Sequence, residues 1–556
     1  MSYDLLIRSG RVVDGTGNPS FHADIGVADG RIVDIGPSLS GSARQTIDAS
    51  DLVVSPGFVD PHTHYDAQIC WDTAMTPSVW HGVTSVVMGN CGVGVAPCRP
   101  AMRDIVMHDL VNVEGIPVDV LKQGIRWEWE TFPEYMAAAA RHPTSINLGF
   151  LAPLTPLRHF VMGEASMERA ANEAEIAALK AVIKEAVSAG ALGFSTSNLL
   201  QHIGYQGRPL ACRNASLDEL KAGAEALREL GKGTVEIALC RDTSVLSDDE
   251  YAMLDMLLTA SGRPVSWISL LHRDDKPDAC RDTLKKAAPL IARGANPQSS
   301  SLPLTRELRM NNPFIFAAFP SWKPAFNKAK PELVALFISA DFRNAFREDL
   351  KRITTRRWDR FVVSAPHTPA LKKYETMTVA DIAREWGKDG VDTFLDFLLA
   401  DELETEFTVA TLNVTEDRVP EILTNPGVLI GLGDAGAHVA QTCDAGYCTY
   451  LLGKWVREKG IMSLEHAIHR LTAQPASIFG IKDRGRIQKG LAADFAIFDP
   501  TTVGSASRGV KRNDLPGNGT RYVIEARGIH TTVVNGTVAW ADGKVTDARA
   551  GRVLKS

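Results

Sequence analysis

The feature that most constrains the fold is an alternation of apolar, strand-like runs with amphipathic helical segments through the middle of the chain. Residues 172–189 place apolar side chains on one helical face and stop at Gly190, and Ser216 forms a capping box with Glu219 before another helix. Such alternation is typical of βα units around a parallel sheet, and the number and spacing of the runs favour a (β/α)8 TIM barrel over an open sheet. The candidate strands include SVVMGN, SINLGFLA, GTVEIALC, RPVSWISLL and GVLIGLGD.

Both ends of the chain have a different sequence pattern, in which short strand-like runs are separated by DG and NG turns. A chain of 556 residues has room for more than one core. We therefore predict an α/β fold in which residues 1–56 and 481–556 form one small β-sandwich domain and residues 57–480 form a TIM-barrel catalytic domain. Extra Pro, Asn, Ser and aromatic residues from about 275 to 360 indicate an elaborated insertion in the barrel domain.

The charge and composition exclude several classes of partner. The net charge is −6 without a Lys/Arg cluster, so there is no electrostatic footprint for nucleic acid or anionic lipid. No apolar run approaches the ~18 residues of a membrane-spanning helix, and the N-terminal residues lack the features of a signal peptide. The eight cysteines show no CxxC spacing. We expect a cytoplasmic protein with a small-molecule partner, and the sequence leaves a homo-oligomer open.

The sharpest chemical feature is an H-x-H pair that ends the apolar segment VVSPGFVDPHTH, residues 53–64. Side chains two apart on a strand point to the same side, so His62 and His64 can present two neutral imidazoles to one metal ion. In a TIM barrel the catalytic groups gather at the carboxyl ends of the strands, which is where this pair falls. The alternative is two histidines satisfied by hydrogen bonds in a turn.

A second apolar strand, VLIGLG, ends in Asp434 and is followed by His438. A lone aspartate after a strand is often a helix cap or a turn former. In a closed barrel, however, the carboxylate of the last strand can reach the metal held by the first strand and can also accept a proton from the attacking water. His438 is a candidate ligand, proton shuttle or substrate contact, and its alternative is a loop histidine bonded to the backbone.

Five longer motifs support a resemblance to a known family: PGFVDPHTH, VVMGNCG, GALGFSTS, GDAGAH and LTAQPASIFGIKDRGRIQKGLAADFAIFDP. From about residue 3 to the C-terminus the chain resembles the amidohydrolase superfamily, and within it the N-acyl-D-amino-acid deacylases (the D-aminoacylase-like branch). The resemblance implies that His62 and His64 are metal ligands and that Asp434 is both a ligand and the catalytic base. It also implies a thiolate ligand at Cys91, for which the alternative is a buried, apolar residue.

The chain departs from this family at two expected metal-ligand positions. The resemblance implies a histidine at the ends of strands five and six, but the matching segments GTVEIALCRD and RPVSWISLLHRDD place Leu239 and Leu270 there. His272 and Glu236 are candidates to replace the missing histidines. The resemblance therefore implies Zn2+ or another divalent metal ion, with one or two ions per chain left open.

Further candidates for substrate binding lie near other predicted strand ends. Arg158 can bind a substrate carboxylate through two parallel hydrogen bonds. The full set of candidates is Arg158, His159, His202, Tyr205, His272 and His438.

Together these features predict a metal-dependent amidohydrolase. We expect it to cleave an amide-type carbon–nitrogen bond of a small, N-acyl amino acid-like molecule with a metal-activated water. Two alternatives stay open: a lactonase or other esterase on the same barrel, and a metal-free binding or scaffold protein that has lost the site.

Overall fold

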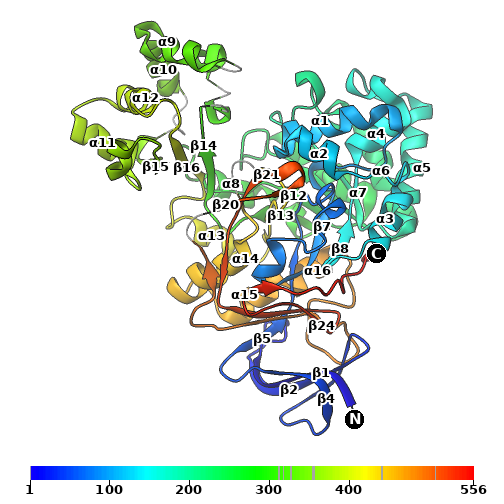
Figure 1. Ribbon diagram of the computed structural model, residues 1–556. Helices are drawn as coiled ribbons and strands as arrows, with labels where there is room; N and C mark the ends of the chain where they lie inside the picture. The colour runs from blue at the N-terminus through cyan, green and yellow to red at the C-terminus, as the bar shows by residue number, and fades with distance from the viewer. Residues whose placement is uncertain are drawn as a thin grey trace. The chain divides into compact units, whose positions relative to one another are not determined.

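The computed structural model describes residues 2–310, 313–316, 319–325, 328–352, 357–439, 443–506 and 509–556, with Phe314 described by its backbone alone. The chain divides into two compact units (Figure 1). Unit 1 comprises residues 1–271, 278–302 and 419–556, and unit 2 comprises residues 272–277 and 303–418. Among the described residues, no helix has the length and apolar character needed to cross a membrane.

Strands from both ends of the chain share one sheet in unit 1, where the blue and red strands of Figure 1 lie together. Strand β18 is the link, because Phe495 pairs with Pro56 of β5 in an antiparallel register. Buried aliphatic side chains such as Ile25 and Val533 pack on this sheet. Its strands, in spatial order, are β25 (Lys544–Val545), β24 (Thr537–Ala541), β23 (Ile529–Val534), β18 (Phe495–Phe498), β5 (Val53–Pro56), β1 (Ser2–Val12), β2 (Phe21–Ala28) and β3 (Arg31–Gly36), with β4 (Ser42–Asp48) paired to β1.

The parallel strands of unit 1 follow one another in chain order around a ring. Leu151 separates β8 from β9, and its N–H donates to the carbonyl of Met88 on β7. A parallel bridge between Thr63 and Ala435 joins the first strand to the last. The strands are β6 (Phe58–Asp60), β7 (Val83–Met88), β8 (Asn147–Phe150), β9 (Ala152–Pro153), β10 (Gly193–Ser197), β11 (Thr234–Ala238), β12 (Val265–Ile268), β13 (Ala295–Ser299) and β17 (Leu429–Ile430).

Several ring strands are buried along their whole length, as expected for parallel strands covered on both faces. Neighbouring register positions on β10, β11 and β12 carry Ser195, Glu236 and Ser266, so these polar side chains share one face. Gln298 of β13 donates to the hydroxyl of Ser266 at 2.8 Å and extends this polar layer.

The helices of unit 1 connect the ring strands and include both helices expected from capping signals. α5 begins after Asn172, whose capping box with Glu175 is present, and ends before Gly190. α6 begins after Ser216 with the predicted capping box. The helices are α1 (Arg103–Glu114), α2 (Val118–Gly124), α3 (Phe132–Arg141), α4 (Leu154–Met162), α5 (Glu173–Ala189), α6 (Leu217–Leu230), α7 (Asp248–Ser261), α8 (Ala279–Ile291), α13 (Val419–Leu423), α14 (Tyr447–Tyr450), α15 (Leu464–Leu471) and α16 (Ala473–Ile478).

Unit 2 has its own aromatic core, in which Phe316 stacks on Trp322 with ring centroids 4.0 Å apart. Its antiparallel sheet has the order β14 (Leu304–Leu308), β16 (Glu406–Leu412), β15 (Phe361–Ala365), and its helices are α9 (Lys330–Ile338), α10 (Ala340–Arg352), α11 (Val379–Trp386) and α12 (Gly390–Ala400). The sequence predicted an insertion at about 275–360, whereas residues 278–302 belong to unit 1, with α8 and β13. Unit 2 also continues to Arg418, because β16 lies between β14 and β15. Residues 311–312, 317–318, 326–327 and 353–356 of the expected insertion lie outside the described residues.

Candidate metal centre

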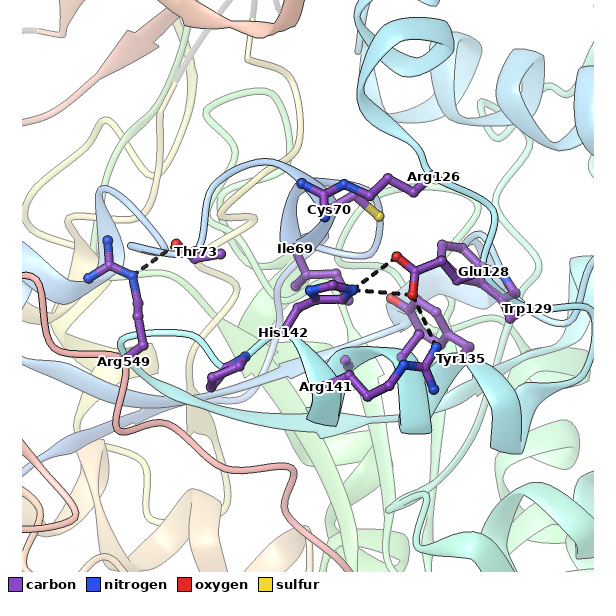
Figure 2. A pocket seen from close by; sticks show the side chains of 13 residues that line it. Ile69, Cys70, Thr73, Arg126, Glu128, Trp129, Tyr135, Arg141, His142 and Arg549 are labelled. Atoms are coloured by element: carbon purple, nitrogen blue, oxygen red, sulfur yellow. Dashed lines mark hydrogen bonds and ion pairs between the residues drawn. The ribbon is translucent and has the colours of Figure 1, made fainter.

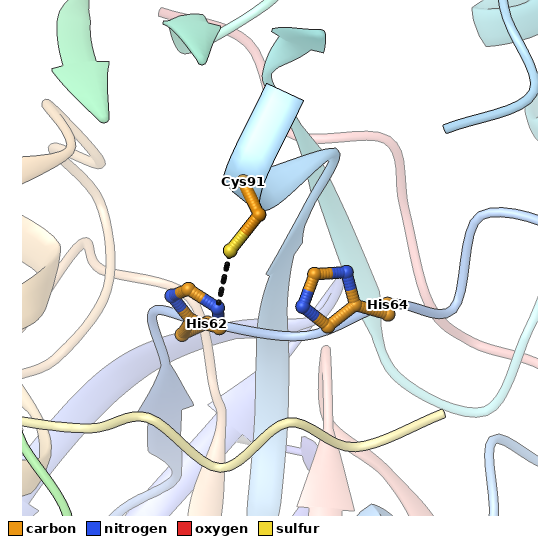
Figure 3. Close-up of side chains that lie close together, drawn as sticks. All are labelled: His62, His64 and Cys91. Carbon is orange, nitrogen blue, oxygen red and sulfur yellow. Dashed lines mark hydrogen bonds between the residues drawn. The ribbon is translucent and has the colours of Figure 1, made fainter. Parts of the chain in front are cut away.

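His62 and His64 lie just beyond β6 and converge with Cys91, which follows β7 (Figure 3). The three side chains are buried, and their ligand atoms all lie within 4.8 Å of one another. The Sγ atom of Cys91 is 3.5 Å from Nε2 of His62, and the two imidazole centroids are 5.2 Å apart. The structure therefore gathers the three predicted nitrogen and sulfur ligands into one cluster.

The backbone around Cys91 explains how the thiol reaches the histidines. Gly89 and Cys91 both have positive φ, at 81° and 56°, so the chain turns sharply as it leaves β7. The N–H of Cys91 donates to Oε2 of Glu236 at 2.7 Å. Glu236 belongs to the polar layer of β10 to β13, so that layer supports the Cys91 backbone through this hydrogen bond.

Asp434 completes the cluster from the end of β17. Its Oδ1 lies 3.3 Å from Nε2 of His62 and 3.7 Å from Nε2 of His64. The Asp434 side chain is 21% exposed, whereas those of His62 and His64 are 0% and 4% exposed. Asp434 is therefore the solvent-facing member of the cluster and is positioned to meet a small molecule.

The electrostatics favour neutral imidazoles with lone pairs available for a metal ion. Burial lowers the pKa of His62 to about 3 and holds the pKa of His64 well below its usual value. Burial, and then the neighbouring Glu236, raise the pKa of the Cys91 thiol. A bound cation would lower the pKa of the Cys91 thiol, because a metal ion stabilises the thiolate form of a cysteine ligand, and it would also keep the imidazoles neutral.

Further carboxyl groups surround the cluster, and some of their buried oxygen atoms have no hydrogen bond among the described residues. These atoms include Oδ2 of Asp60, Oε1 of Glu114 and Oε1 of Glu236. Oε1 of Glu114 lies 3.2 Å from Nδ1 of His64, an ion-pair distance that lacks hydrogen-bond geometry. Buried polar atoms are normally satisfied, so these orphaned oxygens and the mixed N, S and O donors fit a divalent metal ion such as zinc.

Of the predicted substrate-binding residues, His202 lies near the cluster. Its charge contributes to the lowered pKa values of both His62 and His64, and its Nδ1 is held by the hydroxyl of Ser197 at 2.7 Å. His438 is tied to the same region, because its backbone N–H donates to the carbonyl of Glu114. Tyr205 lies further along the His202 loop, where its N–H donates to Oδ1 of Asp109 at 2.8 Å.

Arg158 and His159 lie on α4 and are engaged inside the protein. Arg158 is fully buried; its guanidinium pairs with Glu219 and also donates to the carbonyl of Ser166 at 3.1 Å. The imidazole of His159 contacts Asp109 at 3.0 Å and Ser166 at 2.7 Å. Their polar atoms therefore take part in a buried network that fixes α4 and α6.

The two leucines at the expected histidine positions are buried in apolar clusters. The backbone N–H of Leu239 donates to Ile268, and that of Leu270 donates to Gln298, so both follow directly on ring strands. His272 belongs to unit 2, where its N–H donates to Asn413 at 2.7 Å. Of the two proposed replacements, Glu236 contacts the cluster through the backbone N–H of Cys91.

Asp60, Glu114 and Gln298 are neighbours of the cluster that were not predicted from the sequence. Asp60 could have been predicted, because it ends β6 two residues before His62, and its Oδ1 accepts the N–H of His62 at 3.1 Å. Glu114 had none, because it is the last residue of α1 and reaches the centre through the packing of that helix. Gln298 lies close enough to His62 to oppose the effect of burial, which lowers the pKa of that imidazole.

Comparison with known proteins agrees with this geometry. D-aminoacylase from Alcaligenes xylosoxydans xylosoxydans is 28% identical over 563 residues, which cover 99% of this chain and 97% of that protein. The crystal structure of a D-aminoacylase that defines a novel subset of amidohydrolases has a TM-score of 0.67 at 25% identity, with 100% of both chains covered. The N-acyl-D-glutamate deacylase of Bordetella bronchiseptica, complexed with zinc and a phosphonate inhibitor, has a TM-score of 0.67 at 26% identity, also with 100% of both chains covered.

These likenesses confirm the predicted fold class, an α/β protein with a (β/α)8 TIM barrel and a small β-sandwich domain. They also confirm the predicted resemblance to the deacylase branch. The family whose sequence pattern matches residues 45–539 is described as the Amidohydrolase family. Because that match spans most of the 556 residues, the chain belongs to the Amidohydrolase family.

Proposed function

We propose that this protein is a metal-dependent hydrolase that uses water to cleave the amide-type carbon–nitrogen bond of a small, N-acyl amino acid-like molecule. One observation carries the proposal: His62, His64 and Cys91 converge within 4.8 Å at the ends of β6 and β7, and Asp434 meets them from the end of β17. The similarity to D-aminoacylase and to N-acyl-D-glutamate deacylase supports the amide bond and the N-acyl amino acid class.

The ligands of the metal ion would be His62, His64, Asp434 and Cys91, a donor set that suits zinc. When bound, a divalent ion polarises a carbonyl oxygen and lowers the pKa of a water molecule. Glu236 would support the centre by holding the backbone of Cys91, and Glu114 by its contact with Nδ1 of His64.

Asp434 would carry the proton during hydrolysis. Its carboxylate accepts a proton from the attacking water and returns it to the leaving nitrogen, so one group acts first as base and then as acid. Its partial exposure places it where substrate and water arrive. We assign His202 to substrate binding, because Ser197 fixes its Nδ1 and leaves Nε2 for a substrate atom.

The domain and location predictions belong to the same proposal. The composite β-domain of residues 1–56 and 481–556 would support a catalytic domain of residues 57–480. Eight unpaired cysteines agree with a reducing compartment such as the cytoplasm. The substrate would be the partner, without nucleic acid or a membrane.

The test compares the parent protein with Asp434→Asn and with a His62→Ala, His64→Ala double variant. Turnover is measured on N-acetyl amino acids of both configurations and on matched esters, and metal content by elemental mass spectrometry. We expect Asp434→Asn to fold and to lose roughly 100- to 10,000-fold in kcat. The double variant should lose the metal ion.

Unchanged turnover by Asp434→Asn would refute the assignment of the base. Faster cleavage of the esters than of the amides by the parent would favour the lactonase or esterase alternative. A parent protein with neither bound metal nor activity after zinc is added would favour the binding-protein alternative.

A further inference from the structure

A cavity lies in unit 1, and none of the candidate metal ligands lines it. Its volume is about 330 Å³, and Figure 2 shows the side chains around it. It is formed by the segment that follows the H-x-H motif, by α3 with the segment before it, and by Arg549 near the C-terminus. This volume falls within the range of small-molecule sites, which runs from roughly 300 to 1,000 Å³.

One end of the cavity is apolar and aromatic. Trp129 and Tyr135 pack with ring centroids 4.8 Å apart, and Ile69 lies beside them. The polar atoms of both rings are already bonded elsewhere: Nε1 of Trp129 donates to Val95 at 3.0 Å, and the Tyr135 hydroxyl donates to Asp66 at 2.8 Å. The rings therefore offer apolar surface to an occupant of the cavity.

The rim of the cavity carries an excess of positive charge. Glu128 is the one acidic lining residue, and its carboxylate accepts hydrogen bonds from Arg141 at 3.0 Å and from His142 at 2.9 Å. The bond from Arg141 lowers the pKa of Glu128, so this carboxylate is charged and offsets Arg141. Within the described part of the chain, Arg126 and Arg549 have no carboxylate partner, which leaves two guanidinium groups beside the cavity.

Arg549 is held in place by neutral acceptors. Its Nε donates to the Thr73 hydroxyl at 2.8 Å, and its Nη1 donates to the carbonyls of Thr546 and Ala548 at 2.8 and 2.9 Å. These contacts use Nε and Nη1 of Arg549, so its Nη2 group remains as an oriented hydrogen-bond donor for an occupant of the cavity. A fixed guanidinium beside an apolar surface is a suitable receptor for a carboxylate.

Cys70 also lines the cavity, but its chemistry does not suit a nucleophile. Burial raises the pKa of its thiol to about 11, so the group is protonated near neutral pH. The thiol is the unreactive form of cysteine. An occupant of the cavity is therefore bound without a covalent bond to Cys70.

We propose that this cavity is a second binding site, separate from the metal centre, for a small organic carboxylate with an apolar or aromatic body. The apolar body packs on Trp129, Tyr135 and Ile69, and the carboxylate is bound at the rim, where Arg126 and Arg549 supply the positive charge. This inference stands on the cavity alone and does not depend on the proposed hydrolase function.

The test is calorimetric titration of the full-length, metal-loaded protein with 4-phenylbutyrate. The matched probes are 4-phenylbutanamide, which lacks the charge, and acetate, which lacks the apolar body. We expect saturable binding of 4-phenylbutyrate and at least roughly tenfold weaker binding of either matched probe.

Arginine variants test whether 4-phenylbutyrate binds in this cavity. Arg126→Gln, and Arg126→Gln combined with Arg549→Gln, should weaken 4-phenylbutyrate binding by roughly tenfold or more. Arg126→Gln has no hydrogen bond of its side chain to lose among the described contacts, so it tests the site even if the double variant fails to fold. Arg384→Gln, at a side chain that is 79% exposed in unit 2, is the control and should bind as the parent does.

The His62→Ala, His64→Ala variant should keep the binding. The inference is overturned if 4-phenylbutyrate does not bind, if the amide binds equally well, or if both arginine variants bind as the parent does. It is also overturned if binding is lost in the histidine variant and kept in the arginine variants, because the ligand then occupies the metal centre.

Discussion

Replacing Gly89 with alanine should disturb the candidate metal centre through the backbone alone. Gly89 has φ of 81° and lies two residues before Cys91. A Cβ atom added there would lie 2.2 Å from the carbonyl oxygen of Leu151, closer by about 1 Å than ordinary packing allows. Leu151 links β8 to β9 in the ring wall, so the Cys91 loop is the part that must move. A shift of that size exceeds the ~0.5 Å tolerance of a well-held site.

The chain offers a matched control for this substitution. Gly231 ends α6 with φ of 66°, and a Cβ atom there would have nothing within 4 Å. Gly231→Ala therefore carries only the left-handed strain of about 1–2 kcal/mol. Gly89→Ala adds an overpacking cost of about 1–3 kcal/mol, which gives a total of about 2–5 kcal/mol.

Two assays measure the effect of Gly89→Ala. Urea unfolding of chelator-treated protein gives the free energy of unfolding, and competition with a chromogenic chelator gives the zinc affinity. We expect zinc affinity to fall by roughly 10- to 100-fold in Gly89→Ala, the range for lost ligand support, and to stay unchanged in Gly231→Ala. Equal stability losses in the two variants, together with unchanged zinc affinity, would refute the reasoning.

Three further outcomes follow from the geometry. Arg158→Met should leave Glu219 as an uncompensated buried charge and lower the free energy of unfolding by about 3–5 kcal/mol, while KM of the folded enzyme, measured by initial rates, stays unchanged; a large rise in KM would instead assign Arg158 to substrate binding. Glu236→Leu should remove the acceptor for the Cys91 N–H and weaken zinc binding in the chelator competition by roughly 10- to 100-fold, with Glu236→Gln closer to the parent because its amide oxygen still accepts; equal losses would contradict a hydrogen-bonding role. Removal of metal by chelation should lower the thermal unfolding midpoint, and zinc at about 100 times its Kd should restore about 2.7 kcal/mol; a midpoint that ignores both treatments would contradict a resident ion.

The parts of the centre that sequence could predict are those set by local patterning. The H-x-H pair and Asp434 follow apolar strands, and the carboxyl ends of barrel strands meet at one face. Cys91 needed the family resemblance, since a cysteine in an apolar segment is otherwise a buried thiol. The helices at 172–189 and after Ser216 were predictable because capping and periodicity are local signals.

The parts that sequence could not predict depend on packing between distant segments. Arg158 resembled a carboxylate-binding residue, but its carboxylate partner in the structure is Glu219, the capping-box residue of α6. Nothing near Arg158 in the sequence identifies that partner. The extent of unit 2 has the same origin, because the pairing of β16 between β14 and β15 joins segments far apart in the chain.

Glu236 is a buried carboxyl group that points to a functional site, although the apolar pattern of its strand predicts only a core position. It stands in a fully buried strand, where a carboxyl group is costly unless something compensates it. Burial, with a contribution from the charge of Asp434, raises the pKa of Glu236 to about 8, and the same two causes raise the pKa values of Glu114 and Asp60. Each of the three also carries a buried oxygen that lacks a hydrogen bond among the described residues. Carboxyl groups that repel one another around neutral imidazoles are stabilised by a divalent cation, so the chemistry of the surroundings favours the same occupant as the ligands themselves.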